Sequence, residues 1–132
     1  MTYLRKRNLF LSIASGVALV VGLMATLLPD TFLVSKGVAP VAGTVLWMRE
    51  TGLLLLAFSG FAFAARQLPA SPFTFRFLII NVAVQFGLLM FEIVAYGAGT
   101  LTGWASVVPS SLLNVMLAIG FLGCAVYQPR TE

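Results

Sequence analysis

The chain has 132 residues, of which 60% are hydrophobic and only 9% are charged. Soluble domains are usually about half apolar and a quarter charged, so this composition argues against a water-soluble fold. The sequence has no histidine and a single cysteine. It therefore excludes histidine-ligated haem or zinc, Ser-His and Cys-His catalytic pairs, an intramolecular disulfide and a Cys-x-x-Cys motif. The net charge is +4, but most basic residues flank apolar runs, so we expect no nucleic-acid partner.

Four apolar runs occupy residues 8–28, 45–65, 75–97 and 106–127. Each run is close to the ~20 residues that cross the hydrocarbon core of a bilayer as an α-helix. The connectors are short, which makes consecutive helices antiparallel neighbours. The sequence therefore predicts a single transmembrane domain over residues 1–132, an all-α, integral membrane, antiparallel four-helix bundle.

The ends of the runs carry recognisable signals. A basic start at Arg5, Lys6 and Arg7 could open a signal peptide, but the run that follows is about 21 residues long and lacks a small-x-small cleavage site. We therefore expect a retained helix that ends at Pro29 and is followed by a loop. Before the third run, Ser71 and Pro72 have the form of an N-cap followed by a proline at the first helical position.

The distribution of basic residues predicts the orientation of the chain. With four spans, the basic N-terminus, the connector with Arg66 and Arg76, and the tail with Arg130 lie on one side of the membrane. The opposite side has Lys36 as its clearly extramembrane base. Loops rich in Lys and Arg stay in the cytoplasm, so we expect both termini to be cytoplasmic.

Three charged residues lie within the predicted spans, namely Arg49, Glu50 and Glu92. At about 1.5 Å per residue, Arg49 lies roughly 6 Å and Glu92 roughly 7–8 Å below the outer boundary. Similar depth on consecutive helices predicts an Arg49–Glu92 ion pair. Charges inside a span are costly and usually functional, so this pair marks the candidate site.

The polar residues of the third run fall on one narrow stripe of the helix. At 100° per residue, Asn81, Gln85, Glu92 and Tyr96 lie within about 60° of one another, and lipid on that face would leave them unpaired. We expect an outer-leaflet pocket whose ligand-binding residues are Arg49, Glu50, Gln85, Glu92 and Asn114. In the competing structural interpretation, Arg49–Glu92 is a clamp between helices and the amides are interhelical hydrogen-bond partners.

The first half of the chain resembles a known group of membrane proteins. The features are the first helix ending near Pro29 and an Arg-x-x-Gly element, Arg49 to Gly52, that opens the second helix. They look like those of DoxX-like and related small bacterial four-helix membrane proteins. The resemblance implies a small bundle in the bacterial inner membrane and no defined chemistry.

The function that these features favour is non-enzymatic. We expect a protein that binds a lipid or small amphipathic molecule, or an accessory subunit of a homo-oligomer or larger membrane complex, with no cofactor, metal or catalytic residue. One alternative is a small-molecule transporter in which Glu92 is the proton-coupling site. Another is a membrane enzyme acting on a lipid or isoprenoid, with Glu50 or Glu92 as general acid or base.

Overall fold

The computed structural model describes residues 2–101 and 103–128, and this part of the chain is all-α. It contains four long helices, α1 (Tyr3–Leu27), α3 (Ala42–Ala65), α4 (Pro72–Gly97) and α5 (Trp104–Val126), and the short helix α2 (Pro29–Ser35). All four long helices are long and apolar enough to cross a membrane. The predicted fold class is therefore confirmed.

The helices extend beyond the apolar runs at several ends. α1 begins at Tyr3, so the basic residues before the first run belong to its first turns. α4 begins at Pro72, and the hydroxyl of Ser71 accepts a hydrogen bond from the Thr74 backbone N–H at 3.2 Å. The predicted N-cap and first-position proline are thus confirmed, because they satisfy an N–H group that the helix itself leaves unpaired.

The short helix α2 lies in a segment that the sequence predicts to be a loop. Pro29 ends α1 but also occupies the first position of α2. Proline suits that position because its fixed φ is helical and its missing N–H is not needed there. Asp30 lies in the first turn, where its negative charge interacts favourably with the helix dipole, and Leu33 is buried. The prediction of an unstructured connector after Pro29 was therefore wrong.

α1 and α3 pack along a seam of small residues that allows the two backbones to approach closely. Ser15 and Ser59 each donate a hydroxyl to the other's backbone carbonyl, both at 2.9 Å. A Cβ atom built on Gly52 would lie 2.8 Å from the carbonyl oxygen of Gly22. Such close contact is typical of helix packing in membranes. Gly60, also on α3, is exposed and has open space beside it.

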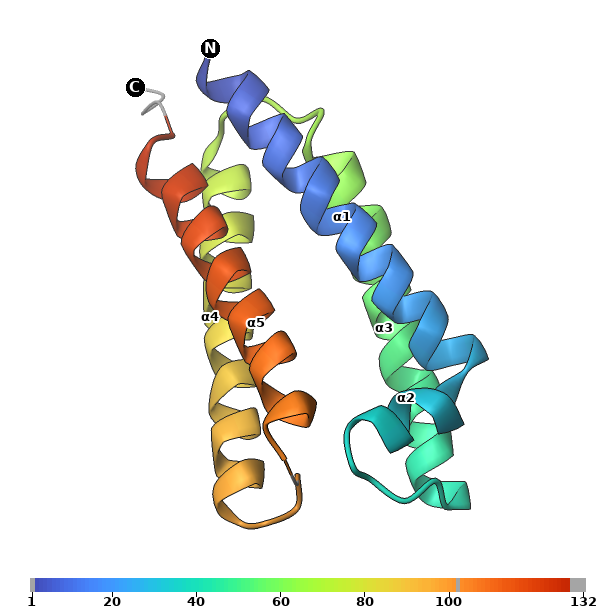
Figure 1. Cartoon of the computed structure of the whole chain (residues 1–132). Helices are drawn as coiled ribbons and strands as arrows, with labels where there is room; N and C mark the ends of the chain where they lie inside the picture. The colour runs from blue at the N-terminus through green and yellow to red at the C-terminus, as the bar shows by residue number, and fades with distance from the viewer. Residues whose placement is uncertain (1, 102, 129–132) are drawn as a thin grey trace.

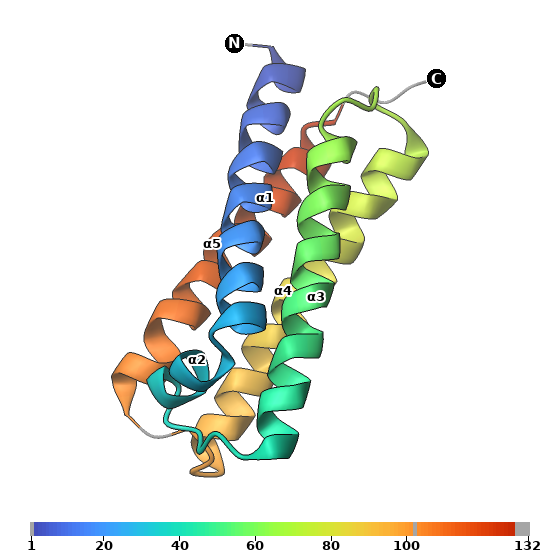
Figure 2. The ribbon, with the colours of Figure 1, turned by 90° about the vertical axis from the view of Figure 1, so that its right-hand side faces the viewer.

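The four long helices form two antiparallel hairpins, α1–α3 and α4–α5 (Figure 1). The hairpins meet at the end of the molecule where α1 begins and α5 ends, which we call the basic end, and they diverge toward the end that carries α2, the α2 end (Figures 1 and 2). α3 and α4 follow one another in the chain but have few contacts. The expectation that all consecutive helices are neighbours was therefore wrong for this pair.

An aromatic cluster holds the two hairpins together. Phe121 of α5 is fully buried, and its ring meets the edge of Phe10 at a centroid distance of 5.0 Å and that of Phe58 at 6.4 Å. Near the basic end, the Tyr3 hydroxyl donates to the backbone carbonyl of Cys124 at 2.7 Å. These contacts join α5 to both helices of the first hairpin.

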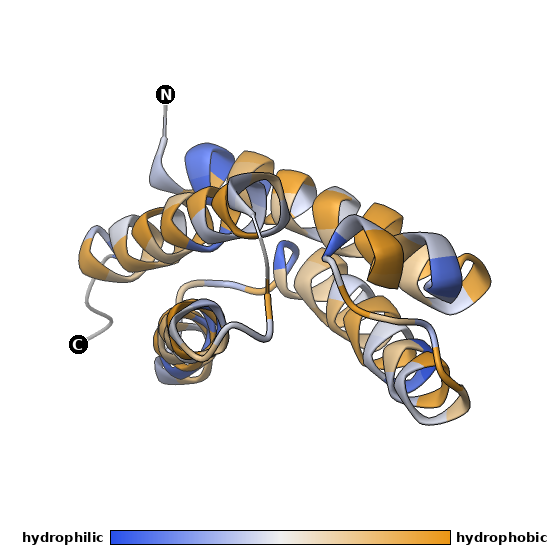
Figure 3. Ribbon diagram, turned by 60° about the horizontal axis from the view of Figure 1, so that its bottom comes forward, coloured by the Kyte–Doolittle hydropathy of each residue, from blue (hydrophilic) through white to orange (hydrophobic). Residues whose placement is uncertain are grey.

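The long helices are hydrophobic along most of their length (Figure 3), and many of their large apolar side chains are exposed. Only 17% of the most apolar window of α3, of α4 and of α5 is buried inside the protein. Water would be a poor solvent for the remainder, whereas hydrocarbon solvates it without penalty. The chain is accordingly a multi-pass membrane protein.

Candidate functional site

A polar cluster lies at the α2 end of the α4–α5 hairpin. The Lys36 ammonium, from the residue that ends α2, lies 3.8 Å from the Glu92 carboxylate of α4. It also donates to the Ser110 hydroxyl at 2.6 Å and to the Ser106 carbonyl at 2.9 Å, both on α5. Lys36 thereby joins the connector between α1 and α3 to both helices of the second hairpin. We call Lys36, Glu92, Ser110, Ser111 and Asn114 the polar cluster.

Glu92 is held by more than its ion pair. One carboxylate oxygen accepts from the Ser111 hydroxyl at 2.8 Å and from the Asn114 amide at 3.4 Å. Both Lys36 and Glu92 are mostly buried, with side chains 22% and 18% exposed. Hydrogen bonds to the charged form offset part of the desolvation that burial imposes on a carboxylate.

The predicted Arg49–Glu92 ion pair was wrong. Glu92 pairs with Lys36, while Arg49 is exposed on α3 and has no hydrogen bond or ion pair within the described part of the chain. The physical reason is the divergence of the hairpins, which separates α3 from α4 at this depth (Figure 1). Glu50 is likewise exposed on α3 and lies outside the polar cluster, so geometry supports neither residue as part of the site.

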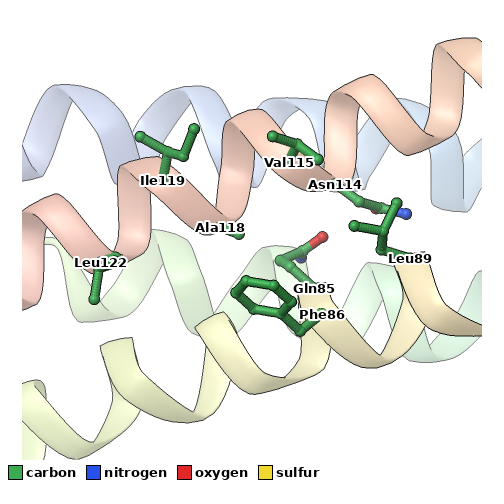
Figure 4. A pocket seen from close by; sticks show the side chains of 8 residues that line it. All are labelled: Gln85, Phe86, Leu89, Asn114, Val115, Ala118, Ile119 and Leu122. Atoms are coloured by element: carbon green, nitrogen blue, oxygen red, sulfur yellow. The ribbon is translucent and has the colours of Figure 1, made fainter.

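A groove of about 190 Å³ runs between α4 and α5 next to the polar cluster. Six of its lining side chains are apolar, and the two polar ones are Gln85 and Asn114. Figure 4 shows Gln85 reaching from α4 toward α5, with Asn114 and Leu89 on the side nearer the polar cluster. The volume lies below the ~300–1,000 Å³ of pockets that enclose a drug-sized molecule, so the groove suits one segment of a ligand.

Gln85 is the unusual residue of this groove. Its side chain is 6% exposed, and its carbonyl oxygen is buried without a hydrogen-bond partner. A buried unsatisfied acceptor costs about 1–3 kcal/mol. Asn81, one turn away and 5% exposed, satisfies its own amide by donating to the Phe77 carbonyl at 2.8 Å. The contrast leaves Gln85 with an unpaired, buried carbonyl oxygen beside the groove.

The predicted polar stripe of α4 faces α5 over most of its length. Asn81 and Gln85 are buried, and Glu92 is mostly buried among residues of α5. Tyr96 departs from the pattern, because it is 40% exposed and its ring lies 5.9 Å from that of Trp104. Asn81 bonds within its own helix, so the expectation that it joins two helices was wrong.

Asn114 links the groove to the polar cluster. It lines the groove and also donates to Glu92. Polar groups therefore follow one another from Lys36 at the α2 end, through Glu92 and Asn114, to Gln85 near the middle of α4. Such a path offers polar contacts to a molecule that enters from the α2 end of the protein.

Lys36 is the site residue that the sequence interpretation missed. The sequence places it in a loop outside the membrane, because its segment holds the turn and loop residues Gly37, Pro40 and Gly43. One signal pointed to it, because it is the clearly extramembrane base on the side of the membrane to which Glu92 lies nearer.

The described residues contain no group of three or more His, Cys, Asp or Glu side chains that could hold a metal ion. Comparison with protein-family models, with curated proteins and with solved structures finds no match. The resemblance to DoxX-like proteins therefore stays a prediction.

Proposed function

We propose that this protein binds a small amphipathic molecule, or a segment of a lipid, in the groove between α4 and α5. The ligand presents a hydrogen-bond donor, such as a hydroxyl or amine, to Gln85, and its apolar part lies along the groove. The observation that carries the proposal is the buried Gln85 oxygen without a partner, in a groove that is otherwise largely apolar. Ligand pockets commonly combine an apolar lining with a few such polar groups.

The polar cluster supports the same proposal from the α2 end. Lys36 and Glu92 keep part of their surface exposed, so they can contact the polar portion of a molecule before its apolar portion enters the groove.

The bacterial inner membrane, with the termini in the cytoplasm, is the setting we propose on the basis of the basic flanks. In that setting the α2 end faces the periplasm. Alkaline phosphatase fused after Gln128 would then lie in the cytoplasm and should be inactive. An active fusion would show that the orientation is the opposite one.

A photoreactive fatty alcohol tests the ligand site. The purified full-length protein in detergent is irradiated with a diazirine-bearing alcohol, and separately with the matched alkane that lacks the hydroxyl. Adducts are mapped by mass spectrometry. We expect the alcohol to label groove residues such as Val115 and Ile119. A neutral hydrogen bond of about 0.5–1.5 kcal/mol corresponds to a preference over the alkane of roughly two- to tenfold.

Two variants of α4 sharpen the test. Gln85→Leu should remove the preference for the alcohol, because it deletes the acceptor. Asn81→Leu is the matched control, since Asn81 is equally buried on the same face but bonds within its helix. Equal labelling by alcohol and alkane in the unchanged protein would show that the groove does not select a donor, and the proposal would then be wrong.

One alternative function has an observation in its favour. Glu92 stands at the α2 end of the path that leads to Gln85, which is where a transporter would hold a proton-coupling carboxylate. Substrate-dependent proton release that disappears in Glu92→Gln would establish this function. For the alternative of a lipid enzyme, the groove has neither Glu50 nor Glu92 in its lining, so no acid or base faces a substrate held there.

A further inference from the structure

A second groove lies at the basic end, between the first turns of α1 and the last turns of α5. Its volume is about 500 Å³, and it is separate from the groove beside Gln85. Lys6 and Arg7 supply its charge, Phe10 and Ile119 supply apolar surface, and Tyr3 and Tyr127 complete its aromatic lining. This combination of positive charge, aromatic rings and apolar surface suits an amphipathic molecule with an anionic head.

Arg7 is the buried charged residue of this groove. Its side chain is 1% exposed. One guanidinium nitrogen, Nη2, donates to the carbonyls of Leu68 and Arg66, the latter at 3.3 Å, and to the Asn8 side chain at 3.4 Å. The other two nitrogens, Nε and Nη1, are buried with no hydrogen-bond partner.

No carboxylate forms an ion pair with Arg7 among the residues that the structure describes. A buried charge is strongly destabilising unless an opposite charge and hydrogen bonds compensate for it. Backbone carbonyls supply part of that compensation here, and an anion in the adjoining groove would supply the rest. A guanidinium N–H also forms a strong, charge-assisted hydrogen bond with a phosphate oxygen.

We propose that the groove between α1 and α5 binds the headgroup of an anionic phospholipid. The lipid phosphate lies between the exposed Lys6 ammonium and the buried Arg7 guanidinium, and the start of an acyl chain lies against Phe10 and Ile119. A phospholipid is the occupant because the groove opens at the end of a membrane-spanning hairpin, where headgroups lie. Anionic lipids are attracted to basic residues at that level by about 1 kcal/mol per charge.

Native mass spectrometry of the full-length protein in detergent tests this site, with phosphatidylglycerol and phosphatidylcholine of identical chains as probes. We expect phosphatidylglycerol to bind at least about fivefold more tightly, the factor that corresponds to ~1 kcal/mol. Lys6→Gln should lower the affinity for phosphatidylglycerol about fivefold. Lys6 is chosen because Arg7 also binds the connector after α3, so replacing Arg7 would affect folding as well as lipid binding.

A groove-filling variant gives an independent readout. Gly123 lines the groove and a Cβ atom there would meet no atom within 4 Å, so Gly123→Leu should occupy part of the groove and abolish the preference for phosphatidylglycerol. Gly16→Leu, on an equally open part of α1 outside the groove, is the matched control. The control should bind like the unchanged protein.

A variant of Arg5 distinguishes binding in the groove from a general attraction of anionic lipids to basic residues. Arg5 is exposed at the same end but does not line the groove. Arg5→Gln should leave the affinity within about twofold, because screened surface charges contribute little individually. Equal binding of the two lipids, equal losses in Arg5→Gln and Lys6→Gln, or displacement of the lipid by millimolar inorganic phosphate would each overturn the lipid assignment.

Discussion

Gly22 and Gly52 lie opposite one another where α1 meets α3. A Cβ atom at Gly52 would lie 2.3 Å from the Thr26 hydroxyl oxygen and 2.8 Å from the Gly22 carbonyl oxygen. At Gly22 the nearest atoms, the Gly52 carbonyl oxygen and the Leu56 Cγ, are at 3.0 Å. Backbone atoms cannot move aside as a flexible side chain can, so Gly52 requires glycine for steric reasons, whereas a Cβ atom at Gly22 would make a tight contact.

Replacing Gly52 by alanine should therefore separate α1 from α3. We expect Gly52→Ala to lower the free energy of unfolding by about 1–3 kcal/mol, as overpacking of a close contact does. Gly60→Ala is the control, because a Cβ atom there meets nothing within 4 Å. Unfolding by dodecyl sulfate in mixed micelles, followed by circular dichroism, measures both. Equal stabilities would contradict the role assigned to Gly52.

At the same scale, sequence reasoning located one half of the candidate site. Gln85, Glu92 and Asn114 could be predicted because polar residues inside a span are few and must avoid lipid. The partner of Glu92 could not, because depth along a helix does not fix which neighbouring helix lies beside it. Arg49 has a suitable depth, but α3 turns away from α4, and Lys36 reaches Glu92 instead.

Among the elements, the short helix α2 positions the residue that joins the two hairpins at the α2 end. It has seven residues and ends at Ser35, and its C-cap residue Lys36 contacts both helices of the second hairpin. The hairpins diverge at this end (Figure 1), so the contacts of Lys36 span the gap between them. Because Leu33 is buried, α2 is held by apolar packing as well as by this polar contact between the hairpins.

Removal of the Lys36 charge should weaken this contact between the hairpins. We expect Lys36→Met to lower the free energy of unfolding by about 1–3 kcal/mol, because it leaves the mostly buried Glu92 without its cation. Arg49→Met should change it by less than about 0.5 kcal/mol, since Arg49 is exposed and unpaired. Thermal unfolding in detergent distinguishes the two.

A double-mutant cycle with Glu92→Gln measures the pair directly. Because Lys36 and Glu92 are in contact, their substitutions should be non-additive by about 0.5–3 kcal/mol. Arg49 and Glu92 should show additive effects. The reverse outcome, with coupling to Arg49 and none to Lys36, would restore the ion pair that the sequence suggested.

In the whole molecule, two hairpins are joined mainly through one aromatic cluster. Phe121 contacts Phe10 and Phe58 and is fully buried. Tyr3 and Lys36 add polar contacts between the hairpins, whereas α3 and α4 have few contacts, so the relative position of the hairpins depends on a limited number of side chains.

Phe121→Ala should therefore widen the range of distances between the hairpins. Removing a buried phenylalanine typically costs about 3–5 kcal/mol. Spin labels on cysteines placed at Gly60 of α3 and Gly87 of α4, in a Cys124→Ser background, report the distance by pulsed electron paramagnetic resonance. Both sites have open space beside them. Phe91→Ala, on a ring that is 74% exposed, should leave the distribution unchanged, and an unchanged distribution in Phe121→Ala would contradict the interpretation.

The four spans themselves could be predicted because each follows from a continuous apolar run, which is a local property of the sequence. Their arrangement as two separate hairpins could not, because it depends on which small residues meet. Ser15, Gly22, Gly52 and Ser59 lie at the α1–α3 interface, whereas Gly60, of the same kind, does not. Lipid is as apolar as the side chains, so hydropathy alone does not distinguish a buried face from an exposed one.

The contacts of Arg7 also impose an order on the assembly of the chain. The carbonyls that it binds follow it in the sequence by 59 and 61 residues. A nascent chain that ends before Arg66 has no such carbonyls to offer. Arg7 can therefore form these hydrogen bonds only after α3 and the segment that follows it have been synthesised. The hydrogen bonds of its buried guanidinium are complete only when both helices of the first hairpin are present.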